Sequence, residues 1–484
     1  MTTPLRSLLL LACAVPFAAL ADPAPMTSPL PYPPTKAVPV EQTLHGETFT
    51  DPYQWLEDGK APDVQEWMSA QDGLTRKTLA AIPERAGFEA RVKQLIYVDS
   101  IGVPFRRGDR LFFSEKKKDQ EKAVIYWRPV KGGEAKVVLD PLQFAADGTT
   151  SIGSYSPSWD GKLVAYQVKP NNSDTARYEV REVDTGKVLT RDTIEGGRYA
   201  GAEWTQDNKA FYYTSYPTDP AIPVDQRPGK TEVRFHVLGT DPATDKVIHP
   251  AMNDASVFHS GSLSWDGRWL TLAIDHGWTR NDVLVMDLHA KEPKFVPVFE
   301  GKDALFRVDV WKDKMYVWST QGSPRGALWT VDLLAKDPAA AAAQKLIIPE
   351  RKDHAIEGFA LVGGRLALNT LVDAASRLEL YELSGKKVME VKLPGIGSAS
   401  GLSGDPRYHE AYFQFESFTY PSEVRELDVK TGKSKVVFKI AVPIKPEDFE
   451  VRQIFGTSKD GTRVPVFITQ KKGLPKDGQA PTIL

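Results

Sequence analysis

The sequence predicts a mainly β protein built around a seven-bladed β-propeller. A tight Asp-Gly turn that feeds an alternating apolar strand, clearest at Ser158–Val168, is the first observation. The second is its recurrence, with intervals that range from 42 residues (Gly364 to Pro406) to 59 residues (Asn208 to Gly267). Each interval has room for about four short strands. Four-stranded units repeated near every fifty residues are typical of propeller blades.

The recurring turns share one more property, because a basic residue follows each of them and an alternating strand comes next. The turn positions are Asp109, Gly161, Asn208, Gly267, Asp313, Gly364 and Pro406. Seven units predict seven blades over residues 98–441. A solenoid would have shorter and more uniform repeats, and a sandwich would not repeat sevenfold. The run Ala339–Ala343 is interpreted as an insertion of one helical turn in blade five.

The ends of the repeat predict how the ring closes. Blade one is expected to begin at Ile101 and blade seven to end near Ile440, which leaves neither blade a spare strand for the other. Our hypothesis is that side-chain packing alone joins these two blades. Such a seam would be able to open.

Length and composition indicate a globular protein of more than one unit. A chain of 484 residues is too long for one ordinary hydrophobic core. With 41% hydrophobic and 26% charged residues the chain is neither disordered nor fibrous. The net charge of −2 gives no electrostatic reason to expect nucleic acid or an acidic membrane as a partner.

Residues 1–21 are predicted to be a secretory signal peptide. Arg6 precedes an apolar run from Leu8 to Leu20, and the small-x-small sequence Ala19–Ala21 provides a cleavage site. The run is too short to span a membrane, so we expect a periplasmic or secreted protein. The only cysteine, Cys13, lies in this run, where lipid attachment is the alternative to removal with the signal. Removal leaves no thiol for a disulfide, a nucleophile or zinc.

Both flanks of the repeat differ from it. Residues 22–97 start proline-rich, continue with the aromatic and acidic patch Asp51–Asp58, and then change to helical spacing after Pro62, with a second short helix over Arg85–Ile96. Residues 442–484 are expected to be a linker and the start of a new sheet. Its three predicted strands are Phe449–Ser458, Thr462–Thr469 and Ala480–Leu484. Because an apolar strand that stops with the chain has nowhere to bury itself, we expect the sequence to be incomplete.

The sequence contains no recognisable catalytic motif. There is no Gly-x-Ser-x-Gly, and the nearest string, Gly397–Gly401, has the wrong spacing. The eight histidines lack the spacing of metal ligands, and no glycine-rich phosphate loop is present, so neither a metal nor a cofactor is expected. Tryptophans of the blades are interpreted as packing residues rather than a sugar-binding array. They are Trp127, Trp159, Trp204, Trp265, Trp311, Trp318 and Trp329.

Five motifs, in order, carry a resemblance to a known family. Tyr32–Thr35 with Asp51–Asp58 closely resembles the N-terminal signature of the prolyl oligopeptidase family of serine peptidases, with Gln54 in place of the usual arginine. The remaining motifs are similar to its blades and to the entry into its hydrolase domain. They are Ser156–Lys162, Ala202–Asp207 with Phe211–Pro217, Phe415–Pro421, and Ser458–Pro465 with Lys471–Gly473. The resemblance covers Tyr32 to Leu484.

This resemblance implies a two-domain enzyme. A seven-bladed propeller would cap an α/β-hydrolase domain, with residues 22–97 packed on the latter and a Ser-Asp-His triad at the interface. The triad positions would lie beyond Leu484, so no catalytic residue is assigned and the chain as given is expected to be inactive. Tyr199, five residues before Trp204, is the one residue that the resemblance suggests for substrate binding. A plain blade-packing role is its alternative.

Taken together, the sequence predicts a prolyl-oligopeptidase-like serine endopeptidase. Its substrates would be short proline-containing oligopeptides. Its propeller would act as a gate that selects these peptides by size, and the protein would be a monomer. Two alternatives stay open: a non-catalytic secreted propeller that binds peptides or protein partners, and a related oligopeptidase that cleaves after basic residues. A reading frame that continues past Leu484 into a Gly-x-Ser-x-Gly would favour the enzyme, and a stop codon the binding propeller.

Overall fold

A computed structural model of the chain describes residues 31–198 and 200–484. The predicted signal peptide with Cys13, and the predicted substrate contact Tyr199, fall outside the described residues. The chain divides into two compact units, one up to Lys93 and one from Gln94 to Leu484. No helix in the described ranges is long and apolar enough to cross a membrane.

The first unit contains a hairpin and helices. Its elements are β1 (Val40–Leu44), β2 (Glu47–Asp51), the 3₁₀ turn η1 (Gln54–Glu57), α1 (Pro62–Ala80) and most of α2 (Arg85–Ile96). The two predicted helices are confirmed, and α1 starts on a proline, whose missing N–H costs nothing at a helix start. The hairpin was not predicted. Its side chains are nearly all exposed, so no apolar alternation marks its strands.

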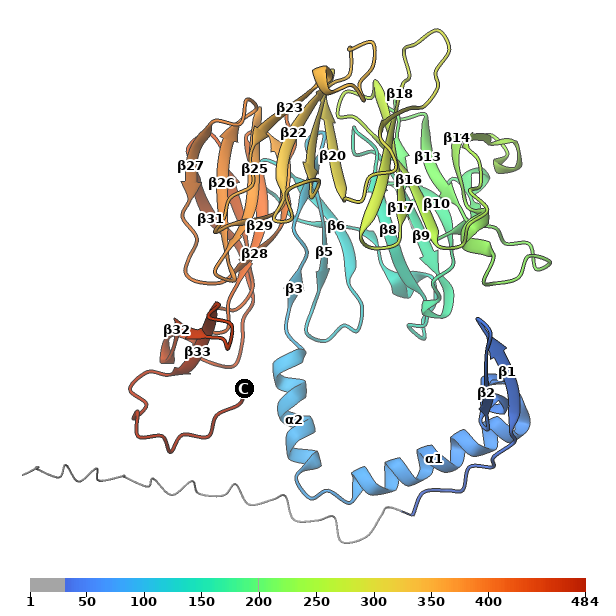
Figure 1. The fold of residues 1–484 in the computed structure, drawn as a ribbon, viewed down its shortest axis with the longest axis vertical. Helices are drawn as coiled ribbons and strands as arrows, with labels where there is room; N and C mark the ends of the chain where they lie inside the picture. Colours follow the sequence, from blue (N-terminus) through green and yellow to red (C-terminus); the bar gives the residue numbers. More distant parts are fainter. Residues whose placement is uncertain (1–30, 199) are drawn as a thin grey trace, which may run out of the picture. The chain divides into compact units, whose positions relative to one another are not determined.

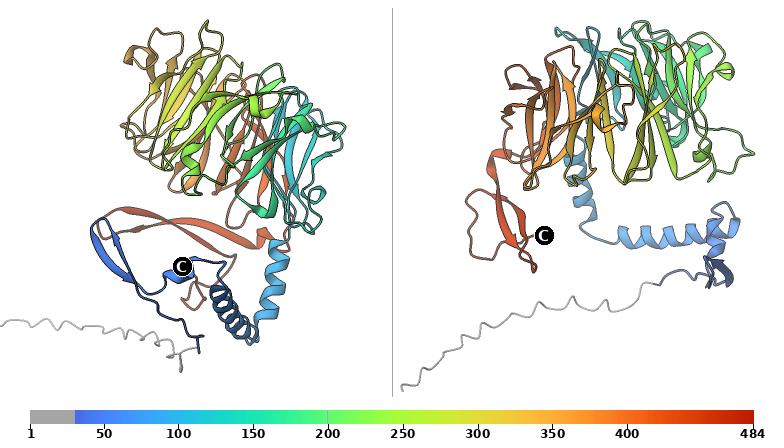
Figure 2. Two further views of the ribbon diagram at one scale, coloured as in Figure 1. Left: turned by 90° about the vertical axis from the view of Figure 1, so that its right-hand side faces the viewer. Right: turned by 45° about the horizontal axis from the view of Figure 1, so that its top comes forward.

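The second unit contains the predicted seven-bladed propeller (Figures 1 and 2). Blade 1 consists of β3 (Ser100–Ile101), β4 (Phe105–Arg107), β5 (Arg110–Lys116), β6 (Val124–Pro129) and β7 (Lys136–Leu139). Blade 2 consists of β8 (Ser151–Pro157), β9 (Leu163–Lys169), β10 (Ala176–Glu182) and β11 (Ile194–Gly197). Blade 3 consists of β12 (Glu203–Trp204), β13 (Ala210–Ser215), β14 (Glu232–Val237) and β15 (Lys246–His249).

The remaining blades repeat this antiparallel order. Blade 4 consists of β16 (Val257–Leu263), β17 (Trp269–His276), β18 (Arg280–Asp287) and β19 (Val296–Phe299). Blade 5 consists of β20 (Phe306–Trp311), β21 (Lys314–Ser319), β22 (Ala327–Asp332) and β23 (Gln344–Ile348). Blade 6 consists of β24 (Ala355–Val362), β25 (Arg365–Val372), β26 (Ala375–Glu382) and β27 (Lys387–Val391). Blade 7 consists of β28 (Ser398–Ser403), β29 (Glu410–Glu416), β30 (Glu423–Asp428) and β31 (Lys433–Lys439).

The seven predicted turns each join the first and second strands of a blade, as expected. Gly161 shows why a glycine is needed at such a turn. Its φ is +69°, and a Cβ there would lie 3.1 Å from the carbonyl oxygen of Arg107 in the neighbouring blade. Asn208, with φ +59°, is the non-glycine residue that best tolerates this conformation.

The direction of the strands defines two faces of the propeller. The chain enters the propeller at Ser100 and leaves it after Lys439 on the same face, which we call the near face. The first and third strands of each blade run away from the near face. The opposite, far face carries the seven recurring turns between first and second strands. The near face carries the connections between successive blades and the turns between second and third strands.

The apolar core lies between successive blades rather than within one. One cluster joins Phe112 of blade 1 to Tyr166 of blade 2, and another joins Val285 of blade 4 to Val317 of blade 5. Each sheet therefore buries both faces against its two neighbours, as a propeller requires.

Blades 1 and 7 share no strand within the described residues. β3 and β4 both pair with β5, so these two short strands together form the first strand of blade 1. At the seam the Arg106 guanidinium lies 3.4 Å from the ring centre of Tyr408 and 3.6 Å from Glu410. Side-chain contacts join these two blades, as predicted.

The segment after blade 7 forms a two-stranded hairpin of β32 (Phe449–Thr457) and β33 (Arg463–Lys471). This pair was predicted, as was the helical turn η7 (Ala341–Ala343) in blade 5. The third predicted strand, Ala480–Leu484, is wrong. It has no paired partner, and Ile483 and Leu484 are fully exposed, so apolar sequence alone does not make it a strand.

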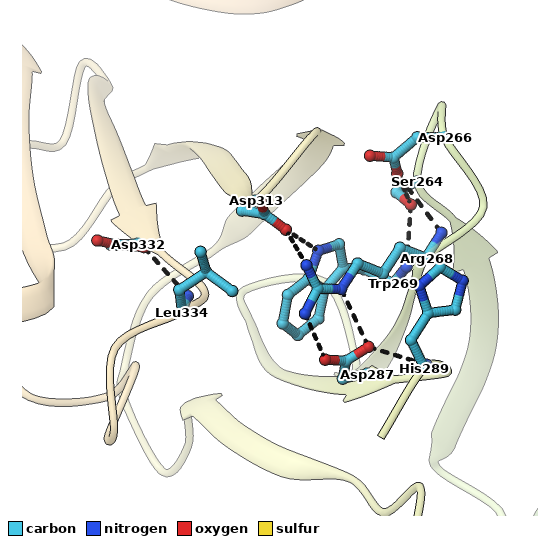
Figure 3. Close-up of polar contacts among 9 residues, drawn as sticks. All are labelled: Ser264, Asp266, Arg268, Trp269, Asp287, His289, Asp313, Asp332 and Leu334. Atoms are coloured by element: carbon cyan, nitrogen blue, oxygen red, sulfur yellow. Dashed lines mark hydrogen bonds and ion pairs between the residues drawn. The ribbon is translucent and has the colours of Figure 1, made fainter. Parts of the chain in front are cut away.

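A charged clamp on the far face joins blade 4 to blade 5 (Figure 3). Arg268 donates two hydrogen bonds to Asp287 of its own blade, at 3.2 and 2.8 Å, and one to Asp313 of the next blade at 2.6 Å. Its guanidinium also lies 4.8 Å from the Trp269 ring centre. A planar fork with several donors is suited to bridging two carboxylates in this way.

We predict that Arg268→Lys destabilises the propeller. A lysine keeps the charge but has no fork to engage both aspartates, so the free energy of unfolding should fall by about 1–2 kcal/mol. Urea denaturation measures this change. The control is Arg280→Lys, an exposed arginine of the same blade, which should change stability by less than about 0.5 kcal/mol. Equal stability of the two variants would show that the clamp contributes nothing.

Candidate functional site

Two identical tetrapeptides bring a pair of tryptophans together at the far end of the central channel. The sequence Ser-Trp-Asp-Gly occurs at Ser158–Gly161 in blade 2 and at Ser264–Gly267 in blade 4. In both copies the serine hydroxyl donates to the aspartate, at 2.7 and 2.6 Å, which fixes the turn in the same form. The rings of Trp159 and Trp265 meet edge to face with centres 5.9 Å apart, although blade 3 separates their blades in sequence.

An arginine from blade 1 lies against this tryptophan pair. The guanidinium of Arg107 lies 4.8 Å from the Trp159 ring centre and 5.9 Å from that of Trp265. Its Nη1 donates to the carbonyl of Arg106 at 3.0 Å. From blade 7, Arg407 lies 5.1 Å from the same Trp159 ring. Cations over aromatic faces are attracted by the ring quadrupole, more so where water is scarce. We call Arg107, Trp159, Trp265 and Arg407 the channel plug.

Two carboxyl groups lie beside the plug with altered acidity. Burial raises the pKa of Glu203 to about 7, and the opposing attraction of Arg107 limits this rise. Burial also raises the pKa of Asp309 to about 6, while a hydrogen bond of 2.9 Å from the Trp265 indole opposes the rise. Burial lowers the pKa of Arg107 itself, against the attraction of Glu203 and Asp405. All three shifts have burial as their main cause, since these half-buried side chains lose part of their contact with solvent.

Two small hollows flank the plug. One of about 190 Å³ is lined by residues that include Tyr155, Trp159 and Glu203, and one of about 280 Å³ by residues that include Trp265 and Phe359. Both are below the roughly 300–1,000 Å³ of ordinary ligand pockets. Each of these two hollows is therefore too small to hold a peptide.

Two larger hollows lie away from the channel. One of about 600 Å³ is lined by Ser376 and Ile396 among others, and one of about 630 Å³ by Trp311 and Lys345 among others. Both are open to solvent and lined by a mixture of charged, polar and apolar side chains. Neither brings buried polar groups together as a binding site would, so neither is assigned.

The described residues show no catalytic or metal-binding arrangement. No serine hydroxyl in residues 31–198 and 200–484 forms a hydrogen bond with a histidine ring, as a triad would require. In the same ranges no group of three or more His, Cys, Asp or Glu residues is placed to hold a metal ion. Tyr199 itself lies outside the described residues, while its neighbour Ala200 accepts a hydrogen bond of 2.8 Å from Gln167 in blade 2.

The channel residues were not identified from the sequence. Trp159 and Trp265 were interpreted as blade-packing residues, and both do pack against core clusters. Their contact across the channel was missed. The repeated Ser-Trp-Asp-Gly was the available signal, since identical turns at equivalent ring positions aim equivalent side chains at one axis. No repeated sequence motif of this kind marked Arg107, Glu203 or Asp309 as channel residues.

Comparisons with known proteins agree on one family. The family model described as the N-terminal β-propeller domain of prolyl oligopeptidase matches residues 32–439. Prolyl endopeptidase of Elizabethkingia meningoseptica is 32% identical over 471 residues, which cover 97% of this chain and 65% of that protein. Prolyl oligopeptidase A of Galerina marginata is 24% identical, over 92% of this chain and 64% of its own length. The chain thus spans slightly less than two thirds of these relatives.

Solved structures share the fold. One from a structural and mechanistic analysis of two prolyl endopeptidases has a TM-score of 0.86 and 45% identity, and the match covers 93% of this chain and 66% of that one. Prolyl oligopeptidase B of Galerina marginata, bound to a 25mer macrocyclization substrate, has a TM-score of 0.83 at 21% identity. It covers 94% of this chain and 67% of its own, and shows the likeness of fold alone.

We predict that Glu203 makes stability depend on pH near neutrality. Because folding raises its pKa from 4.5 to about 7, its contribution is present in full below pH 4.5 and is lost as pH rises through about 7. Glu203→Gln removes this titration. Relative to the wild type, the variant's free energy of unfolding should therefore increase by about 2 kcal/mol between pH 5.5 and 8.

The change with pH is the quantity to measure, by urea denaturation, because replacing the side chain also adds an offset that does not depend on pH. Glu357→Gln, an exposed glutamate of β24, serves as the control and should parallel the wild type. A Glu203 variant that also parallels the wild type would contradict the raised pKa.

Proposed function

The chain belongs to the prolyl oligopeptidase family, and from this premise we propose that it supplies the propeller of a serine peptidase that hydrolyses short proline-containing peptides. The names of the relatives support proline rather than a basic residue as the preferred cleavage position. The hydrolytic residues would come from an α/β-hydrolase domain docked on the near face. Peptide would be the partner, and the working state a monomer.

The observation that carries this proposal is the apolar character of the near face. Six of its connections expose a large apolar side chain at or near their tips, namely Leu142, Val224, Met252, Trp278, Ile396 and Phe418. Trp278 is 95% exposed and Phe418 73%. On the far face the turns expose chiefly Leu334. Exposed apolar groups gathered on one face are typical of a protein–protein contact. A second domain on this face would cover them.

The side-chain contacts of the channel plug support a gating role. With the channel plug in place, a peptide would reach the interior of the ring only from the near face. A hydrolase domain docked there would admit short, extended peptides and exclude folded proteins. The plug is assembled from blades 1, 2, 4 and 7, so no single blade can open it by a local motion.

We also propose that the protein is exported to the periplasm or beyond. Arg6, the apolar run from Leu8 and the small residues at Ala19 and Ala21 support this, as signal peptides have that order of segments. Cell fractionation with the natural N-terminus, beside a version that starts at Asp22, tests it. Retention of both versions in the cytoplasm would contradict export.

We predict that the 484-residue chain alone does not hydrolyse a chromogenic prolyl peptide, because no serine of its described part is activated by a histidine. The product of the natural gene, expressed from its source DNA, should hydrolyse it and be blocked by a serine-directed inhibitor. Turnover by the isolated chain would overturn the first part. An inactive natural gene product would favour the non-catalytic binding propeller. Cleavage of peptides after arginine but not after proline would favour the oligopeptidase that cleaves after basic residues.

A second prediction concerns the gate. In the natural gene product, Trp159→Ala combined with Trp265→Ala should open the far end and raise kcat/KM several-fold for peptides of about thirty residues. A dipeptide substrate, which does not need the wider route, should be unaffected. Trp311→Ala is the matched control, a tryptophan of the far face outside the plug. An unchanged size preference in the double variant would contradict the gating role.

A further inference from the structure

The connection between β13 and β14 is attached at its base to the start of blade 4. It ends in the 3₁₀ turn η5 (Arg227–Lys230), whose Gly229 is buried against the chain that follows β15. A Cβ at Gly229 would lie 2.7 Å from the backbone of Asp254, so the two backbones are in direct contact. The amide of Asn253 donates to the carbonyl of Gly229 at 2.7 Å, and Lys230 donates to the Asn253 side chain at 2.6 Å.

Two histidines continue this attachment into the blades. Thr231, directly after η5, places its hydroxyl 3.3 Å from Nε2 of His259 at the start of β16. Nδ1 of His259 lies 3.2 Å from Nδ1 of His249, the last residue of β15. His259 is 4% exposed and Thr231 3%. The three side chains thus form a chain of hydrogen bonds from the loop base through blade 4 to blade 3, in which Thr231 and His259 are buried and His249 is half-buried.

The donors and acceptors of these side chains indicate which ring nitrogens carry a hydrogen. The Thr231 hydroxyl donates its one hydrogen to the carbonyl of Pro228 at 3.0 Å, so toward His259 it can only accept. Nε2 of His259 therefore carries a hydrogen, and its Nδ1 offers a lone pair. Nδ1–H of His249 donates to that lone pair. This arrangement is complete with both rings neutral. A further proton would turn His259 into a buried cation whose side-chain partners are a hydroxyl and another imidazole rather than a carboxylate.

Neighbouring charges do little to stabilise a cation here. Burial, and then the neighbouring His249, lower the pKa of His259 to about 4, and burial also lowers the pKa of His249. On β14, Glu232 favours a charged His259 weakly, since its carboxylate already accepts a bond of 2.8 Å from Arg234.

The other charged groups around the pair are satisfied elsewhere. Arg227 of η5 donates to the carbonyl of Ile222, and Lys230 is held by Asn253. On β17, His276 shares the sheet face of His259 but is bonded to Asp282 at 2.7 Å, and Asp275 lies on the opposite face. Phe295 covers an edge of His249 with an apolar ring.

We propose that Thr231, His259 and His249 form an acid-sensitive latch for the loop at residues 216–231 on the near face. At neutral pH the uncharged chain of hydrogen bonds holds the base of the loop against blade 4. In mildly acidic conditions, proton uptake by His259 favours conformations in which its ring reaches solvent, and this opens the contact between the ring and Thr231 at the base of the loop. The latch is a property of the propeller and does not depend on the proposed peptidase activity.

Linkage gives the direction and size of the effect. A histidine with a depressed pKa stabilises the closed state fully above 6.5, its ordinary value, and this contribution is lost as pH falls toward about 4. For His259 alone, the equilibrium constant for opening should rise about 30-fold between pH 7.5 and pH 5.

Amide hydrogen exchange on the 484-residue chain tests the latch. Protection factors, corrected for the intrinsic exchange rate at each pH, should fall about 30-fold from pH 7.5 to pH 5 in peptides covering residues 226–233 and 251–260. His259→Gln retains a donor toward Thr231 but does not titrate, so its protection in these peptides should be the same at both pH values. His289→Gln, an exposed histidine of blade 4, should behave as the wild type.

Exchange at the C2 hydrogen of histidine provides a second measurement that needs no variant. It reports the pKa of each ring, and we expect a value well below 6.5 for His259 in the wild-type chain. A value near 6.5 would overturn the latch. An acid-induced loss of protection in His259→Gln equal to that of the wild type would overturn it as well.

Discussion

The burial of apolar surface between successive sheets is the constraint on which the rest of the structure depends. A four-stranded sheet of this kind has two apolar faces and no partner within its own blade. Stacking seven of them around an axis covers every face, and the ring closes where blade 7 meets blade 1. Blades 1 and 7 meet there through Arg106, Tyr408 and Glu410 rather than through a shared strand. The channel, its plug and the two faces follow from this stacking.

The fold was largely predictable because its signals are local. A turn that needs a positive φ restricts the residue type at that position, and the alternation along a strand indicates which side chains are buried. Gly161 and the six equivalent turn residues therefore located all seven blades. The errors have equally local causes. The hairpin of β1 and β2 carries no alternation, and Ala480–Leu484 is apolar but has no partner strand. Strand formation needs an edge to pair with, which a short apolar run does not reveal.

The channel and the latch were not predictable in the same way, because they join residues far apart in sequence. Trp159 and Trp265 are separated by a whole blade, and only ring closure brings their side chains to one axis. Each histidine was judged singly and assigned to the surface or the core. The close approach of His249 and His259 arises at the junction of two blades. The acidity of Glu203 was not predictable either, since its burial among several blades raises its pKa.

The closure of the ring has a mechanical consequence. The chain enters blade 1 and leaves blade 7 on the same face, and these blades are neighbours. A force that separates the two ends, such as the pull of a translocation motor or an unfoldase, would act directly across their junction. Elsewhere backbone hydrogen bonds such as Trp265 to Val310 resist separation. Under load the propeller would therefore open first between blades 1 and 7. The rate at which this one junction separates would set the resistance of the whole ring to forced unfolding.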